Sequence, residues 1–280
     1  MTTAIEIRDL HDLTDLREVI GIETRVWGYP DAAEAVPLPI LAAAVLRGAI
    51  VLGAFDAGTM IAASYSFPAA KHGRLTHWSH MLGVLDAWRD CGVGARLKTR
   101  QRERALEAGV DLIEWTFDPL QAANAHFNLV RLGAVVEDYE VNVYGTSGSP
   151  LWRGTDSDRF VAQWYIREPH VDRRLARRGP IIRDSDILSS VRVLEARALG
   201  DVVEPGQVDL EQGCRRLRVE IPAMFAPIQR DHPQLARAWR ERTRSVFTTC
   251  LARGYRIVDF WLDGRRACGT YLLARSSVPA

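Results

Sequence analysis

The stretch LGVLDAWRDCGVGARL, residues 82–97, decides how this sequence is interpreted. It starts at the end of an apolar, strand-like run, passes through an arginine and two glycines, Gly92 and Gly94, and then begins a helical pattern. One glycine is enough for a turn between a strand and a helix. A second glycine two residues on indicates that a ligand approaches the backbone closely there, because glycine has no Cβ to keep it away.

A helix that begins at such a turn offers a site for an anion. Its first amides have no partner within the helix, and its N-terminus carries about half an elementary positive charge. Phosphate groups bind at such termini. Residues 89–94, RDCGVG, therefore predict a backbone cradle for a phosphate or pyrophosphate. The alternative is a glycine-rich turn with a solvated Arg89, which leaves the second glycine unexplained.

Three known phosphate-binding loops can be compared with these residues. The P-loop pattern GxxxxGK[ST] is absent, and the dinucleotide pattern GxGxxG lacks its third glycine because Leu97 stands at that position. The third pattern is (Arg/Gln)-x-x-Gly-x-(Gly/Ala), placed after a strand and at the start of a helix. Arg89, Gly92 and Gly94 match it at every defined position.

With these residues the sequence resembles the GNAT superfamily of acyl-CoA-dependent N-acyltransferases. The strand–loop–helix segment matches that of the family, with Val84 before a polar turn, then Trp88, then Arg89. The order of elements from Ala4 through about Arg167 agrees as well. The resemblance implies a mixed α/β sheet, acetyl-CoA or another acyl-CoA as co-substrate, and transfer of the acyl group to an amine.

The resemblance also implies which residues contact the coenzyme. Backbone groups of residues 82–85 should pair with the pantetheine arm as a strand would, and residues 89–95 should wrap the pyrophosphate. Two helical asparagines could contact the pantetheine arm, since amides both donate and accept hydrogen bonds; they could equally be helix-surface residues. The full set is Leu82, Gly83, Val84, Leu85, Arg89, Asp90, Cys91, Gly92, Val93, Gly94, Ala95, Asn124 and Asn128.

His80 is the first candidate for the base that deprotonates the amine. It lies four residues before Val84, so the period of a strand puts both on one face. Histidine titrates near neutral pH, and some members of the family carry a catalytic histidine at the matching position. A half-buried structural histidine is the alternative. Glu114 on the next strand is a second candidate, and His77 falls on the opposite face from His80.

The candidate for the general acid departs from the family pattern. Many members donate a proton to the departing thiolate from a tyrosine in the helix after the next strand, and Leu129 occupies that position here. Tyr144 and Tyr139 on the following strand are substitute acids. The loss of the tyrosine also supports a rival function, a non-catalytic acyl-CoA-binding sensor or scaffold.

Composition restricts the class of protein. The chain has 280 residues, 47% hydrophobic and 25% charged, as in an ordinary soluble globular protein. A formal net charge of +1 argues against a nucleic-acid or membrane-surface partner. The four cysteines are far apart with no CxxC, so no metal is expected. No signal peptide and no membrane-spanning run are evident, which predicts a cytoplasmic protein.

The order of patterns predicts two parts joined by a linker. Residues 1–168 form the acyltransferase domain, residues 169–186 a polar, proline-containing linker, and residues 187–280 a smaller α/β portion. This portion contains a strand, a strong helix over residues 232–254 and a hairpin turning at residues 263–264. The same order near the hairpin at residues 56–58 suggests a half-repeat of the acyltransferase sheet; an unrelated α/β cap is the alternative. The apolar face of the helix must be buried, on the first domain or in a homodimer.

The sequence leaves the substrates open. The acceptor is expected to be a small-molecule amine or an amino acid, because the chain resembles a bacterial branch of the superfamily with an added C-terminal portion, some members of which acylate amino acids. Succinyl transfer occurs in that branch as well as acetyl transfer. The donor therefore stays undecided between acetyl-CoA and succinyl-CoA.

Overall fold

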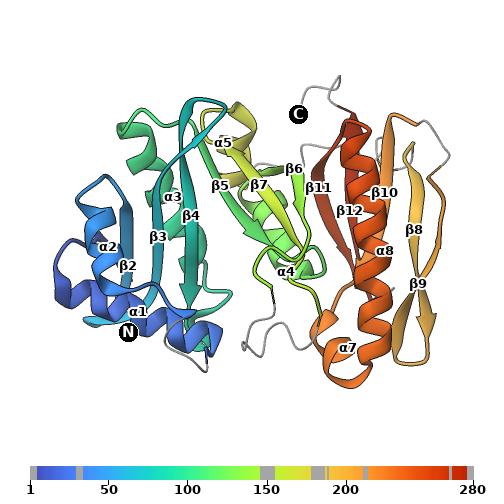
Figure 1. The fold of residues 1–280 in the computed structure, drawn as a ribbon, viewed down its shortest axis with the longest axis horizontal. Helices are drawn as coiled ribbons and strands as arrows, with labels where there is room; N and C mark the ends of the chain where they lie inside the picture. Colours follow the sequence, from blue (N-terminus) through green and yellow to red (C-terminus); the bar gives the residue numbers. More distant parts are fainter. Residues whose placement is uncertain are drawn as a thin grey trace. The chain divides into compact units, whose positions relative to one another are not determined.

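The computed structural model describes residues 5–29, 34–145, 155–177, 187, 189–210, 214–264 and 267–275 of the chain. It contains both helices and strands, and the strands pair in both parallel and antiparallel orientation (Figure 1). The predicted α/β class with a mixed sheet is confirmed. The chain divides into two compact units, and the division falls inside strand β5, Leu112–Phe117, between Trp115 and Thr116.

The first unit holds the elements up to the first part of β5, together with residues 165–167. Strands β1 to β4 pair antiparallel in chain order, and β5 lies parallel to β4. The hairpin predicted at residues 56–58 is confirmed, and it joins β2 to β3. The elements are β1 (Glu6–Asp9), α1 (Leu13–Trp27), α2 (Leu38–Val45), β2 (Ile50–Asp56), β3 (Thr59–Lys71), β4 (Arg74–Val84) and α3 (Val93–Glu107).

Helix α1 has clear sequence signals at both ends and a buried face between them. The carboxylate of Asp12 accepts a hydrogen bond from the amide of Asp15 at 2.9 Å and so caps the N-terminus. Gly28 ends the helix in the left-handed conformation, with φ 61°. In Figure 1, α1 and α2 lie in front of the strands of this unit and α3 lies behind them. The core under α1 and α2 contains Leu16, Val19, Ile22, Leu41, Tyr65 and Met81.

The second unit holds the end of β5 and the described residues that follow it, apart from residues 165–167. Its strands lie in the order β7-β6-β11-β12-β10-β8-β9, and only β10 and β8 are parallel neighbours among the printed pairs of these described strands. The predicted hairpin near residue 263 joins β11 to β12; residues 265 and 266 lie outside the described residues. The strands are β6 (Val135–Glu140), β7 (Arg159–Tyr165), β8 (Val191–Leu199), β9 (Val202–Val208), β10 (Arg216–Pro222), β11 (Tyr255–Asp263) and β12 (Cys268–Arg275). The helices are α4 (Ala122–Ala125), a π-helical segment (His126–Arg131), α5 (Pro169–Leu175), α7 (Phe225–Asp231) and α8 (Pro233–Ala252).

This division lies elsewhere than the predicted linker. Helix α5 occupies the described part of residues 169–186, and residues 178–186 lie outside the described residues. Strands β6 and β7, which fall in the predicted domain 1–168, belong to the same unit as the C-terminal strands. Strand β11 reaches them by pairing antiparallel with β6, with Ile257 opposite Val136.

The apolar face of α8 is buried, as the sequence predicts. Its fully buried side chains include Trp239, Val246, Phe247 and Cys250. The ring of Phe247 lies 4.6 Å from that of Phe160 on β7 and 5.4 Å from that of Tyr271 on β12, centroid to centroid. Strands of the same chain therefore cover this face.

The strand order contradicts the half-repeat hypothesis. In the first unit, β1 precedes the helices and pairs with β2, the first strand of the following hairpin. In the second unit, β10 precedes α7 and α8 and pairs with β12, the second strand of the following hairpin. Similar element order along the sequence thus leads to different neighbours in the sheet, because a hairpin can present either strand to the strand before the helix.

Candidate active site

The predicted phosphate cradle has the backbone conformation that its glycine suggests. After β4, a short 3₁₀ turn, Asp86–Trp88, leads to Gly92, which is the N-cap of α3 with φ 80° and ψ 2°. An added Cβ on Gly92 would meet no atom within 4 Å, so the space beside it is open. Among the described residues, no side chain makes a capping hydrogen bond to the start of α3. The first amides of α3 are therefore open to an anion.

The side chains around the cradle are mostly accessible. Arg89 pairs with the carboxylate of Asp86 at 2.8 Å and donates from Nε to the carbonyl of Val84 at 3.3 Å, so it ties the loop to the end of β4. Asp90 also has a positive φ, 60°. The exposed loop residues are Arg89, Asp90 and Cys91; Gly92, Gly94 and Ala95 are half-buried, and Val93 is buried.

Strand β4 reaches the cradle with one edge paired to β3. Leu82, Gly83 and Val84 lie opposite Ser64, Ala63 and Ala62, and the amide of Leu85 donates to the carbonyl of Ile61 at 3.0 Å. On the other edge, the register with β5 covers His77 opposite Ile113 and Trp78 opposite Glu114. The strand continues past Trp78 to Val84, and this further part is where an extended ligand could add as a strand.

Gly83 has a packing role that the sequence did not reveal. A Cβ at this position would come within 3.0 Å of the Trp27 ring and 3.2 Å of Ile22, both on α1. Any larger residue would push α1 away from β4. The predicted coenzyme contact of Gly83 therefore concerns its backbone, while the absence of a side chain serves the packing of α1.

His80 is the extra residue of a β-bulge. Tyr65 of β3 lies opposite Met81 and Ser66 lies opposite Ser79, so His80 has no opposite residue. Bulges re-aim a side chain and are common near active sites. The imidazole is exposed and lies 5.8 Å from the Tyr65 ring and 6.2 Å from the Phe67 ring, centroid to centroid.

The bulge corrects one expectation about His80. The imidazole lies beside Tyr65, which belongs with Met81 to the core under α1. His80 and Met81 therefore face the same side of the sheet, and the alternation that resumes after Met81 puts Val84 on the other side. The expectation that His80 and Val84 share a face is wrong, because the extra residue interrupts the period of two.

The surroundings of His80 suit a base. Although His80 reaches the surface, the groups packed around its imidazole remove part of its water, and this desolvation lowers the pKa of His80 below its ordinary value of 6.5, which favours the neutral ring. His77, by contrast, is buried and lies 3.3 Å from the hydroxyl of Ser66, and burial lowers its pKa to about 4. Glu114 is buried and bound by Lys71, whose Nζ donates to its Oε1 at 2.8 Å. A role for Glu114 as base would require that ion pair to open.

The candidate acids differ in accessibility. Tyr144 is 45% exposed, and its hydroxyl lies 2.8 Å from that of Thr116. Tyr139 is half-buried and donates to the carboxylate of Asp158 at 2.6 Å; burial, reinforced by that hydrogen bond, raises its pKa strongly. Tyr139 therefore holds its proton firmly, and Tyr144 is the more accessible candidate.

The two asparagines lie on consecutive helical segments, and the second segment is not a regular α-helix. Asn124 is exposed on α4, whereas Asn128 is buried on the π-helical segment. Such segments are rare and occur frequently at functional sites. Leu129, at the position of the family's tyrosine, is fully buried.

Lys98 is a buried polar residue that the sequence analysis did not single out. It lies on α3, and its Nζ donates to Ser79 Oγ at 2.9 Å and to Gln101 Oε1 at 3.0 Å, 3.8 Å above the Trp115 ring. Burial lowers its pKa to about 7. The charge pattern of the helix does not distinguish Lys98, because Arg100 and Arg104 on the same helix are half-buried and pair with Asp9 instead.

Within the described ranges, no three His, Cys, Asp or Glu side chains gather closely enough to hold a metal ion. No helix in the part of the chain that the structure describes is long and apolar enough to cross a membrane.

Comparison with known proteins finds likeness in structure only. No family model and no curated protein matches the sequence. A GNAT-family acetyltransferase from Desulfovibrio desulfuricans is 17% identical, with 58% of this chain and 99% of that chain covered and a TM-score of 0.46. An acetyltransferase from Salmonella typhimurium, solved with its cofactor acetyl-CoA, is 20% identical over 59% of this chain and 95% of that one, with a TM-score of 0.46. An aminoglycoside acetyltransferase from an uncultured soil metagenomic sample is 18% identical over 44% and 84%, with a TM-score of 0.38.

Proposed function

We propose that the chain is an acyl-CoA-dependent N-acyltransferase of the GNAT type, acting on the amine of a small molecule such as an amino acid. The observation that carries the proposal is the cradle at residues 89–94. It combines a left-handed Gly92, open space beside it and an uncapped start of α3 with a strand, β4, that leads straight into it. Acetyl and succinyl groups both remain candidates for transfer.

The cradle fits the diphosphate of coenzyme A in charge and in shape. Amides at the start of α3 would bind phosphate oxygens, and the absence of a Cβ on Gly92 would let them approach. The backbone of residues 82–85 would bind the pantetheine arm, and bound coenzyme would supply the activated thioester. Holding a thioester and an amine together in this way lowers the barrier by roughly 7–11 kcal/mol.

In the proposed reaction, His80 takes a proton from the ammonium form of the acceptor. The amine nitrogen then attacks the thioester carbonyl and a C–N bond forms. The nitrogen gives up its second proton to water, and the C–S bond breaks with loss of the thiolate. The thiolate takes a proton, for which Tyr144 is the proposed source. A positioned base contributes about 10²–10⁴-fold to such a reaction.

The test combines binding and turnover on the purified chain. Calorimetry with coenzyme A measures the first, and release of free thiol from acetyl-CoA and succinyl-CoA across a panel of small amines measures the second. Binding and amine-dependent thiol release are expected. Failure to bind coenzyme A would refute the proposal.

A sensor or scaffold is the second candidate, and one observation favours it. Leu129 stands at the position of the family's tyrosine and is fully buried. Its hydrocarbon side chain has no acidic proton, so it cannot protonate the thiolate. Tight binding of coenzyme A without turnover on any amine would support the sensor.

A further inference from the structure

The corner between β5 and α4 is built around one buried carboxylate. Asp118 follows directly after β5 and is only 6% exposed. Its Oδ1 accepts a hydrogen bond from the amide of Leu120 at 2.8 Å, and its carbonyl accepts one from the amide of Gln121 at 3.1 Å. These bonds turn the chain from the strand into the helix that carries Asn124.

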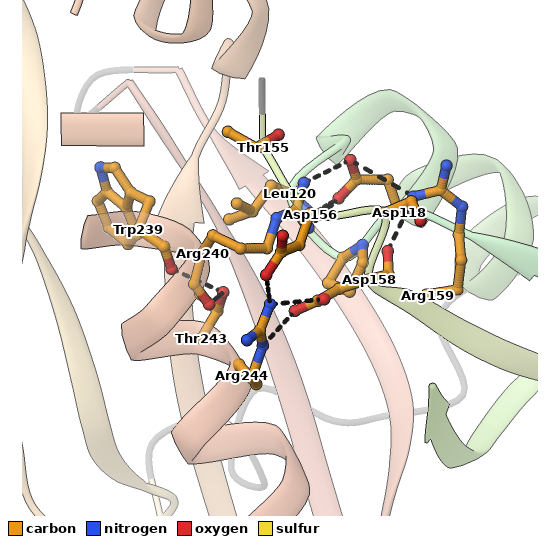
Figure 2. Close-up of polar contacts among 12 residues, drawn as sticks. Asp118, Leu120, Thr155, Asp156, Asp158, Arg159, Trp239, Arg240, Thr243 and Arg244 are labelled. Carbon is orange, nitrogen blue, oxygen red and sulfur yellow. Dashed lines mark hydrogen bonds and ion pairs between the residues drawn. The ribbon is translucent and has the colours of Figure 1, made fainter. Parts of the chain in front are cut away.

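Two residues from the C-terminal part of the chain hold this corner. Arg240 on α8, also buried, donates to Asp118 through both terminal nitrogens, at 2.7 Å to Oδ1 and 2.8 Å to Oδ2 (Figure 2). The hydroxyl of Tyr271 on β12, a fully buried side chain, donates to the carbonyl of Pro119 at 2.8 Å. The partners stand 122 and 152 positions apart in the sequence.

The next turn of α8 holds the start of β7 in a similar way. Arg244 donates to both carboxylate oxygens of Asp158 at 2.8 Å and to Asp156 at 2.6 Å (Figure 2). Asp158 also accepts from the amide of Asn142 at 3.1 Å, and nearby the amide of Tyr144 donates to Ser157 at 2.9 Å. One face of α8 thus contacts both the corner that leads to the two asparagines and the segment beside Tyr144.

The charges make the hold on the corner specific. Burial alone would raise the pKa of Asp118, but the guanidinium of Arg240 keeps that pKa below its ordinary value, so the carboxylate stays ionised. A paired, bidentate contact of this kind fixes direction as well as distance. Arg240 on α8 and Tyr271 on β12 therefore hold the corner in the arrangement that the structure shows.

We propose that Arg240 and Tyr271 are positioning residues, which set the β5–α4 corner and through it the asparagines predicted to contact the pantetheine arm. This inference rests on the proposed function and deepens it. The corner, the asparagines and the two residues that hold the corner all belong to the same unit. Because the asparagines are predicted to contact the pantetheine arm, loss of this hold should weaken binding of that arm and leave binding of a nucleotide without pantetheine unchanged.

The test compares two tyrosine variants with two ligands. Tyr271→Phe removes only the hydroxyl that binds Pro119. Tyr255→Phe is the matched control, because its hydroxyl donates to another backbone carbonyl, that of Cys214, away from the corner. Each variant is titrated with coenzyme A and with adenosine 3′-phosphate 5′-diphosphate, which has the diphosphate but no pantetheine.

Tyr271→Phe should weaken binding of coenzyme A about fivefold, the effect of one neutral hydrogen bond, and leave binding of the nucleotide unchanged. Tyr255→Phe should change neither. Arg240→Lys keeps the charge but loses the bidentate contact, and it should change the two affinities in the same way as Tyr271→Phe. If Tyr271→Phe does not fold, Arg240→Lys replaces it in the same titrations. The inference would be overturned if Tyr271→Phe and Arg240→Lys had the same affinities as the control, or if they lost affinity equally for both ligands. The proposed function would stand in either case. A wild-type chain that binds neither ligand would overturn the proposed function and this inference with it.

Discussion

At the scale of single residues, the two glycines that flank α3 allow an effect on ligand binding at the cradle to be distinguished from an effect of backbone strain. Gly92 stands before the helix and Gly109 just after it, with φ of 80° and 77°. An added Cβ would meet no atom within 4 Å at either position. The two therefore carry the same conformational requirement, and only Gly92 adjoins the proposed diphosphate.

Gly92→Val should reduce the affinity for coenzyme A at least about tenfold, or about 1.4 kcal/mol. A branched side chain at this position would hold phosphate away from the amides and tolerates positive φ poorly. Gly109→Val should cause the same backbone strain but leave the affinity for coenzyme A unchanged. Calorimetric titration of both variants checks this, and equal affinities in the two folded variants would refute the cradle.

His80→Gln should lower kcat by roughly 10²–10⁴ with little change in coenzyme binding. Desolvation lowers the pKa of His80, so the wild-type rate should fall only as the pH drops below 6.5, where the imidazole gains a proton. The variant should lack this acidic limb. His77→Gln, which removes the buried histidine bound to Ser66, should cost stability and leave the limb in place. A pH–rate profile with the same limb in His80→Gln means that His80 is structural.

From the burial of Lys98 we expect the stability of the protein to depend on pH. Burial lowers its pKa from 10.5 to about 7, so its charge opposes folding fully below pH 7. The cost disappears between pH 7 and 10.5, because there the native lysine loses its proton while the unfolded one keeps it. The free energy of unfolding of the wild-type chain should therefore rise relative to that of Lys98→Met, by at most about 1.4 kcal/mol per pH unit. Urea titrations at neutral pH and about pH 9 test this; parallel values for the two proteins would contradict it.

At the scale of elements, the sequence predicts most helices and strands but misses what depends on distant partners. The spacing of apolar residues and the glycine after it predict α3 and α8 closely, because both signals are local. The bulge at His80 is invisible in β4 alone, since it exists only through the register with β3. The pairing of Lys71 with Glu114, 43 positions apart, is hidden for the same reason. The π-helical segment at residues 126–131 also escapes, because its residues follow an ordinary helical pattern.

The apolar face of α8 should contribute strongly to stability. Phe247→Ala leaves a cavity beside the Phe160 and Tyr271 rings and should lower the free energy of unfolding by about 3–5 kcal/mol. Ser245→Ala, on the exposed face of the same helix, should change it by less than about 0.5 kcal/mol. Urea titration measures both. A small effect for Phe247→Ala would mean that α8 is loosely packed.

At the scale of the whole molecule, the C-terminal part is not expected to be dispensable. A chain that ends at Arg177 lacks α8 and β12, so Phe160 loses the rings of Phe247 and Tyr271 that cover it. Asp118 also loses its bidentate contact with Arg240, and Asp158 loses its contact with Arg244. Gel filtration and thermal unfolding should show an aggregating fragment without a cooperative transition. A soluble, monomeric fragment with full activity would contradict this.

The distance along the chain between Asp118 and Arg240 also has a consequence for synthesis. Ribosomes add about 5–20 residues per second, so Arg240 is made on the order of ten seconds after Asp118, given their separation of 122 positions. During that delay the partners of the emerging carboxylate are the amide of Leu120 and, once it has been made, Arg159, so the corner after β5 lacks its bidentate contact. The part of the protein that is made first can thus mature early, while the second half must await the last helix to leave the ribosome.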